Sequence, residues 1–156
     1  MSTLAKKRKE MSVSFQLKGI ELLEACLNQP KQSNADLKVF HFDIKIEHKL
    51  KTENKLFIAL IDIGLFNEQR DLKLGSLTAN CIFEIENMND FMDTKTKKIN
   101  LPDEFVITLN SITISTARGI MFNQFKGTFL HNAILPIINP ESFLIQKHGE
   151  KIVTLK

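Results

Sequence analysis

Four stretches of the chain alternate apolar and polar side chains, and this pattern constrains the fold more than any other feature of the sequence. The strictest alternation covers residues 40–47, where polar or charged residues separate Phe40, Phe42, Ile44 and Ile46. A period of two places the two sets of side chains on opposite faces of a β-strand. The stretch therefore predicts a strand with one buried face and one face in water.

Three other stretches repeat the pattern, at residues 13–17, 56–66 and 77–85. The polar connections between the last three strands are short, as in antiparallel hairpins. Residues 20–27 are apolar on several sides, so the sequence leaves them open between a longer first strand and a helical turn. Together the four stretches predict an antiparallel sheet that must cover its apolar face with another element.

The second half of the chain contains two helix starts. Asn100, with Pro102 soon after it, has the residue types that begin a helix. An apolar stripe follows at helical spacing, made of Phe105, Leu109, Ile112 and Thr116. Residues 139–142 (Asn-Pro-Glu-Ser) repeat the start and predict a short helix over residues 143–148. The predicted fold class is α+β: a four-stranded antiparallel sheet with one face covered by a long helix and a short C-terminal helix.

Length and charge limit the class of protein. The 156 residues predict one domain at residues 12–148, between a flexible basic N-terminus at 1–11 and a C-terminal tail at 149–156. The net charge of +3 is too small for a nucleic-acid partner. The longest apolar run, residues 56–66, is much shorter than the about 20 residues that a bilayer span needs. No apolar stretch follows the basic residues 6–9, so the sequence predicts a cytoplasmic protein without a secretory signal or membrane insertion.

No motif in the sequence indicates a known chemistry. It lacks a glycine-rich phosphate loop, a metal-ligand spacing and paired carboxylates, so we expect no cofactor, no metal and no catalytic residues. His41 and His48 are expected to be exposed. Cys26 and Cys81 are expected to be buried small hydrophobes, with a single disulfide as the alternative. Asp62 is the one candidate for a perturbed acid, and a hydrogen-bonded or outward-facing Asp is the simpler interpretation. The prediction is that the protein is not an enzyme.

The second half also holds more apolar residues than one sheet and one helix need. Phe122, Phe125, Phe129 and Phe143 lie there, in a chain with 12 Phe, no Trp and no Tyr. Two explanations remain open: a partner subunit buries these residues, or a groove presents them to an apolar ligand.

Several segments, in chain order, resemble the SecB export-chaperone family. Phe15-Gln16-Leu17 with Ile20 resembles the opening strand of that family, and residues 82–85 (Ile-Phe-Glu-Ile) resemble the end of its fourth strand. Residues 112–119, which end in an Arg-Gly pair, are similar to the end of its long helix. Residues 135–139 (Leu-Pro-Ile-Ile-Asn), with Phe143, resemble the stretch that leads into its last helix. The likeness extends over residues 13–146.

The resemblance implies a homotetramer, built as a dimer of dimers, that binds unfolded preproteins without ATP and supports protein export. Apolar burial has no directional requirement, so an apolar groove would accept many client sequences. By the resemblance, the groove would lie between the loop after the first strand and the last helix. The candidate client-binding residues are therefore Leu27, Leu37, Ile137, Phe143 and Leu144.

The chain also departs from the family. The loop at residues 28–36 is shorter, and residues 119–133 form a longer segment than in the export members. The outer strand face has mixed charge and the tail is mildly basic, where the export members are acidic, so coupling to the SecA motor stays open. One alternative function is that of a dedicated SecB-like chaperone for an antitoxin in a toxin–antitoxin module. The other is a non-chaperone oligomeric adaptor whose apolar segment only makes subunit contacts.

Overall fold

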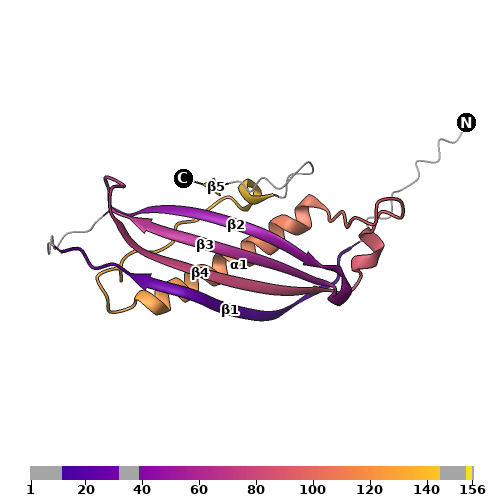
Figure 1. The fold of residues 1–156 in the computed structure, drawn as a ribbon, viewed down its shortest axis with the longest axis horizontal. Coiled ribbons are helices and arrows are strands. Elements are labelled where there is room, and N and C mark those ends of the chain that lie inside the picture. Colours follow the sequence, from indigo (N-terminus) through magenta and orange to yellow (C-terminus); the bar gives the residue numbers. More distant parts are fainter. Residues whose placement is uncertain (1–11, 32–38, 145–153, 156) are drawn as a thin grey trace, which may run out of the picture.

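The predicted alternation is present as four long antiparallel strands. The computed structural model describes residues 12–31, 39–144 and 154–155. Its strands are β1 (Phe15–Leu27), β2 (His41–Lys51), β3 (Leu56–Phe66) and β4 (Lys73–Ile85). They lie side by side in the order β1-β4-β3-β2, and the two-residue strand β5 (Thr154–Leu155) lies beside β2 (Figure 1). The expected four-stranded antiparallel sheet is confirmed.

The inner face of the sheet carries the residues that the alternation assigned to it. In β3 and β4, every second residue is buried and its neighbours are less so. The buried set is Phe57, Ala59, Ile61, Ile63 and Leu65 of β3 with Leu77, Ala79, Cys81, Phe83 and Ile85 of β4. The turn before β3 is the 3-10 helix η1 (Thr52–Asn54), as the polar residues there predict.

Residues 20–27, which the sequence left open, continue β1. They pair with β4 as far as Leu27 opposite Gly75. The pairing contains two register shifts, one between Leu17 and Gly19 and one between Leu22 and Glu24. These shifts explain why simple alternation is not visible over the whole of β1.

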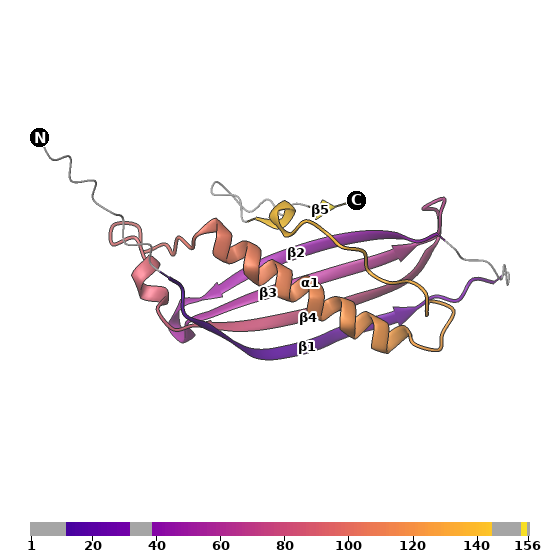
Figure 2. The same cartoon turned by 180° about the vertical axis from the view of Figure 1, so that it is seen from behind.

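The long helix α1 (Asp103–Phe125) lies on the inner face of the sheet and crosses the strands obliquely (Figure 2). It begins beyond Asn100, directly after Pro102, and no side chain caps its first turn. It also continues through Gly119 to Phe125. The 3-10 helix η2 (Met88–Phe91) lies in the connection between β4 and α1.

The apolar stripe expected for this helix is only half correct. Phe105 and Leu109 are buried, but Ile112 and Thr116 are only partly covered. The buried face also includes Val106, Asn110, Thr113, Ile114, Ala117, Met121 and Phe125. The helix is rich in β-branched residues, which lower helix propensity, so packing against the sheet rather than local preference sets its rotation.

After α1 a returning segment runs across the inner side of the molecule toward β2 (Figure 2). This segment leads into the 3-10 helix η3 (Pro140–Phe143). The Asn139 side chain accepts a hydrogen bond from the Glu141 amide, as expected of a cap at this start. The helix predicted for residues 143–148 does not begin at Phe143, because Leu144 is extended. Residues 145–148 lie outside the described residues, as do residues 1–11 and 149–153 of the two predicted terminal regions.

Helix α1 is long and apolar enough to cross a membrane by length and composition alone, with a mean hydropathy of 1.3 in its most apolar window. In the structure 44% of that window is buried. The core helix of a soluble protein passes the same test, so this feature is weak evidence for a membrane span.

The two cysteines are both free and lie in different environments. Cys81 is buried on the inner face, as expected. Cys26 is only half-buried, and it pairs with Ser76 in the sheet register. The expectation that both thiols are buried is therefore wrong for Cys26.

Two glycines allow a matched test of this packing. A Cβ added at Gly75 would lie 2.8 Å from Leu130 Cδ1 and 2.9 Å from the Cys26 carbonyl oxygen, whereas one added at Gly119 meets nothing within 4 Å. We expect Gly75→Ala to lower the free energy of unfolding by about 1–3 kcal/mol, because the backbone of β1 must move. Gly119→Ala should raise it by about 0.5–1 kcal/mol through helix propensity. Urea denaturation measures both, and equal effects would contradict the close contact at Gly75.

Candidate functional site

Exposed apolar side chains of the described chain are most numerous on β1, and the most exposed one lies beside a groove. Large apolar residues that are at least 40% exposed are Leu17, Ile20, Leu22, Leu23, Leu27, Val39, Leu72, Phe122, Ile134 and Ile137. Half of them belong to the outer strand β1. The second region surrounds Ile137, the most exposed apolar residue of this set.

The two register shifts of β1 keep its apolar residues on the inner face of the sheet. Leu17, Ile20 and Leu22 lie opposite Phe83, Cys81 and Ala79, all of which are buried. The extra residues at the shifts absorb the change of spacing from two to three, so the apolar side does not flip. We call Leu17, Ile20, Leu22 and Leu27 the β1 row. These side chains stay 41–50% exposed, and the oblique helix crosses β1 only near the end of the strand (Figure 2).

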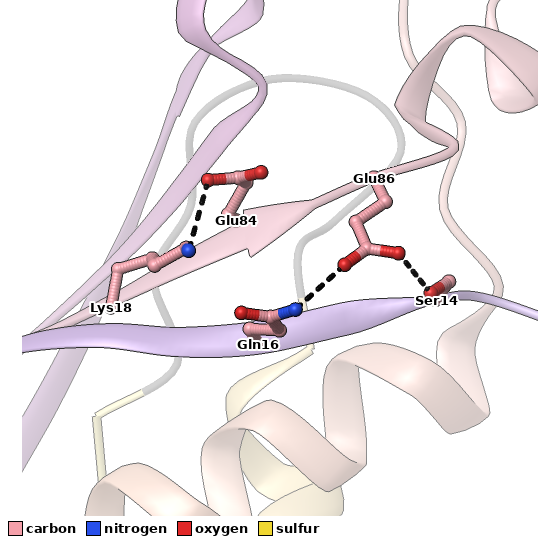
Figure 3. Close-up of polar contacts among 5 residues, drawn as sticks. All are labelled: Ser14, Gln16, Lys18, Glu84 and Glu86. Atoms are coloured by element: carbon pink, nitrogen blue, oxygen red, sulfur yellow. Dashed lines mark hydrogen bonds and ion pairs between the residues drawn. The ribbon is translucent and has the colours of Figure 1, made fainter.

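On the outer face, polar contacts attach β1 to β4. The Glu86 carboxylate accepts hydrogen bonds from Ser14 Oγ at 2.7 Å and from Gln16 Nε2 at 2.8 Å, and Lys18 lies 3.6 Å from Glu84 (Figure 3). All of these groups are exposed, so each contact contributes little to stability. They help to fix the strand whose other face is the apolar row.

The second region is a groove between the start of β2 and the returning segment before η3. It has a volume of about 390 Å³. We call it the β2 groove; its lining is Phe40, Phe42, Ile44, Pro136, Ile137 and Ile138, with His41, Arg70, Asn139 and Ser142 as polar members. Ile137 is 97% exposed, so its side chain gains almost nothing from the fold of the single chain.

Two side chains of α1 hold the far wall of this groove in place. Arg118 donates to the carbonyl oxygens of Leu135 and Pro136, at 2.8 and 2.9 Å. Asn110, which is fully buried, donates to the carbonyl oxygens of Phe143 and Pro140, at 3.1 and 3.4 Å. Because the backbone of the wall is bonded to the helix, Ile137 is presented on a supported segment.

His48 completes this polar support and is not the exposed residue that the sequence suggested. Its Nε2 lies 2.6 Å from Asn110 Oδ1, and its ring packs against Phe57. The Asn110 amide nitrogen already donates to carbonyl groups, so its oxygen is the acceptor and His48 Nε2 carries the proton. Burial lowers the pKa of His48 below its usual value, and the hydrogen bond to Asn110 opposes this shift. The neutral ring therefore links β2, α1 and η3.

The structure does not bring the five candidate client-binding residues into one groove. Ile137 lines the β2 groove, whereas Leu27 is on the opposite edge of the sheet. Phe143 is 2% exposed and belongs to the core, and Leu144 is partly buried against the core. Leu37 lies outside the described residues.

Sequence reasoning missed Phe40 and Phe42 as groove residues. Their alternation marked them as ordinary members of the buried face of a strand, and they are in fact partly covered. No local signal distinguishes them from core residues. Only the path of the returning segment, which stops beside them, makes them line a groove.

Among the described residues, Asp62 and the histidines do not line a common pocket. Asp62 lies on the outer face of the sheet and accepts a hydrogen bond from Thr78 Oγ1 at 2.6 Å, which confirms its simpler interpretation. The shallow hollow around it, of about 410 Å³, has mixed charge and none of the described histidines lines it. Within the described ranges no group of His, Cys, Asp or Glu could hold a metal ion.

No protein-family model and no curated protein matches the chain in sequence. Among solved structures, the chain is similar to a SecB-like chaperone of Mycobacterium tuberculosis in complex with a ChAD peptide from the HigA1 antitoxin. The sequence identity is 13%, the match covers 79% of this chain and 83% of that chain, and the TM-score is 0.47. This likeness assigns neither a family nor a ligand to the chain.

The His48 bridge predicts a pH-dependent stability. The pKa of His48 is lowered in the folded state. The contribution of the neutral ring to the free energy of unfolding is therefore fully present above the unfolded pKa of about 6.5, and it is lost as the pH falls from there toward the folded pKa. We expect the melting temperature to fall between pH 7.5 and 5.5. In His48→Gln, whose amide can still donate to Asn110, this fall should be smaller. An equal fall in both proteins, measured by thermal denaturation, would contradict the assignment.

Proposed function

We propose that this protein is a chaperone that holds unfolded polypeptide segments by apolar burial, without ATP and without enzymatic activity. The observation that carries the proposal is the β2 groove, where Ile137 is almost fully exposed above an apolar lining that includes Phe40 and Phe42. The backbone that supports Ile137 is hydrogen-bonded to α1 rather than free to fold inward.

The chemistry of the groove suits extended, partly apolar segments of many sequences. Burial of one large aliphatic side chain contributes about 1.5–3 kcal/mol, so two or three client side chains give a modest, reversible affinity. The lining phenylalanines lack a polar tip and make no directional demand on the client. The sequence resemblance to SecB supports the same function, with unfolded preproteins, or an antitoxin, as clients in the cytoplasm.

The β1 row has a second role in the proposal, as a contact between copies of the chain. β1 is an outer strand, and it pairs only with β4 among the described strands. An outer strand with exposed apolar residues is an association site in water. We infer that a second copy covers the β1 row, and that pairs of such dimers form the tetramer that the sequence resemblance implies.

Charge placed in the groove should reduce client binding. Ile137→Asp should weaken the affinity for an unfolded test protein, such as reduced and carboxymethylated α-lactalbumin, by roughly tenfold, because one large apolar contact becomes a charged one. Ile134→Asp is the matched control, since Ile134 is 57% exposed but does not line the groove. Fluorescence anisotropy measures both affinities.

Equal affinity of the two variants and the parent would remove the groove as the client site. Absence of any binding by the folded parent would end the chaperone proposal and favour the adaptor. Binding of several unrelated unfolded proteins indicates a general holdase, whereas selective binding of one antitoxin segment indicates a dedicated chaperone.

Charge placed in the β1 row should instead act on assembly. We expect Ile20→Lys to shift the protein toward the monomer in sedimentation velocity, because the apolar contact would then have to bury an unpaired charge. Glu21→Lys changes the neighbouring residue on the outer face and should leave the assembly unchanged. An unaltered sedimentation profile for Ile20→Lys would show that the β1 row is not the contact.

A further inference from the structure

The free edge of β2 carries a short added strand. In the four-stranded sheet β2 is the outer strand opposite β1, and its Ile44 and Lys45 pair antiparallel with Leu155 and Thr154 of β5. Among the described residues this is the only pairing on that side of β2. The remaining backbone groups along the 11-residue edge have no strand partner within the described chain.

The added strand lies at the β2 groove. Ile44, which pairs with Leu155, is also part of the groove lining. β5 lies close to η3 (Figure 2), and Ser142 of η3 also lines the groove. A strand edge with free hydrogen-bonding groups beside an apolar groove is what strand addition of an extended peptide requires: the edge binds the backbone, and the groove takes alternate side chains.

We propose that an extended client segment binds by adding an antiparallel strand to β2 at Ile44 and Lys45, and that β5 occupies this edge until a client displaces it. The inference rests on the proposed function and specifies its binding mode. Residues 152–155 (Ile-Val-Thr-Leu) are all β-branched or apolar. Their composition is therefore similar to that of a client segment that would bind as a strand.

The size of β5 makes it displaceable. A two-residue strand closes few hydrogen bonds, and the net contribution of each to stability is small. A client segment can pair with more of β2 and also fill the groove, so it exceeds β5 in both backbone and side-chain contacts. The tail lowers the apparent client affinity without blocking the site, because a client must first remove it.

Proline in the tail tests the exchange in the full chain. A double variant, Thr154→Pro with Leu155→Pro, removes both amide donors of β5. We expect it to bind reduced, carboxymethylated α-lactalbumin roughly three- to tenfold more tightly than the parent, the range given by losing one or two hydrogen bonds of the competing strand. A control, Thr154→Val with Leu155→Val, keeps the donors and the β-propensity and should bind like the parent.

Hydrogen exchange of the β2 amides around Ile44 and Lys45 gives an independent readout. In the proline variant these amides should exchange faster than in the parent, and addition of the client should slow them again. Client binding that leaves them fast would overturn strand addition.

The outcomes also separate this inference from the proposed function. If the proline variant binds with parental affinity while Ile137→Asp binds weakly, displacement of β5 is overturned and the groove remains the client site. If no protein in the series binds the unfolded client, the proposed function fails and this inference fails with it.

Discussion

One constraint determines most of this molecule: a single helix laid obliquely over a four-stranded sheet cannot cover both edges. α1 and the returning segment bury the middle of the inner face, where β3 and β4 reach nearly complete burial. The apolar side chains of the outer strands are covered less completely. β1 keeps a row of half-exposed aliphatic side chains, and the start of β2 keeps a groove beside Ile137. Both candidate interaction surfaces are therefore products of the architecture rather than separate additions to it.

The two edges differ in how they are supported. Along β2, the wall of the groove is bonded to α1 through Arg118 and Asn110, and His48 joins the same set of hydrogen bonds from the sheet. A buried amide such as Asn110 would be costly without its partners, so the position of η3 depends on all of them together. Along β1 the support is a set of exposed contacts on the outer face. This difference fits the roles proposed for the two edges, a client site along β2 and a contact between copies along β1.

Local pattern was sufficient to predict β2, β3 and β4, because their period of two is unbroken and one face of each strand is apolar. It was not sufficient for β1, where an extra residue at each of two register shifts interrupts the period of two. The apolar face is continuous all the same, and the spacing of Leu17, Ile20 and Leu22 is consistent with it. The rotation of α1 was predicted only in part, since Phe105 and Leu109 are buried but Ile112 is not, and the sheet rather than the helix decides this. His48 and Phe143 were misplaced for a different reason. The environment of His48 depends on Asn110, 62 residues further along the chain, and that of Phe143 on the same Asn110, 33 residues earlier. No local period encodes such contacts.

The irregular pairing of β1 has a further consequence for solubility. A sheet with exposed outer strands is at risk of unlimited edge-to-edge polymerisation, as in amyloid growth. The bulges after Leu17 and Leu22 interrupt the even spacing of hydrogen-bonding groups and increase the local twist. A regular strand from another protein would lose inter-strand hydrogen bonds at each bulge. A partner strand with the same bulges, in the right register, would keep them. The bulges of β1 thus disfavour fibre formation at the most apolar edge of the sheet.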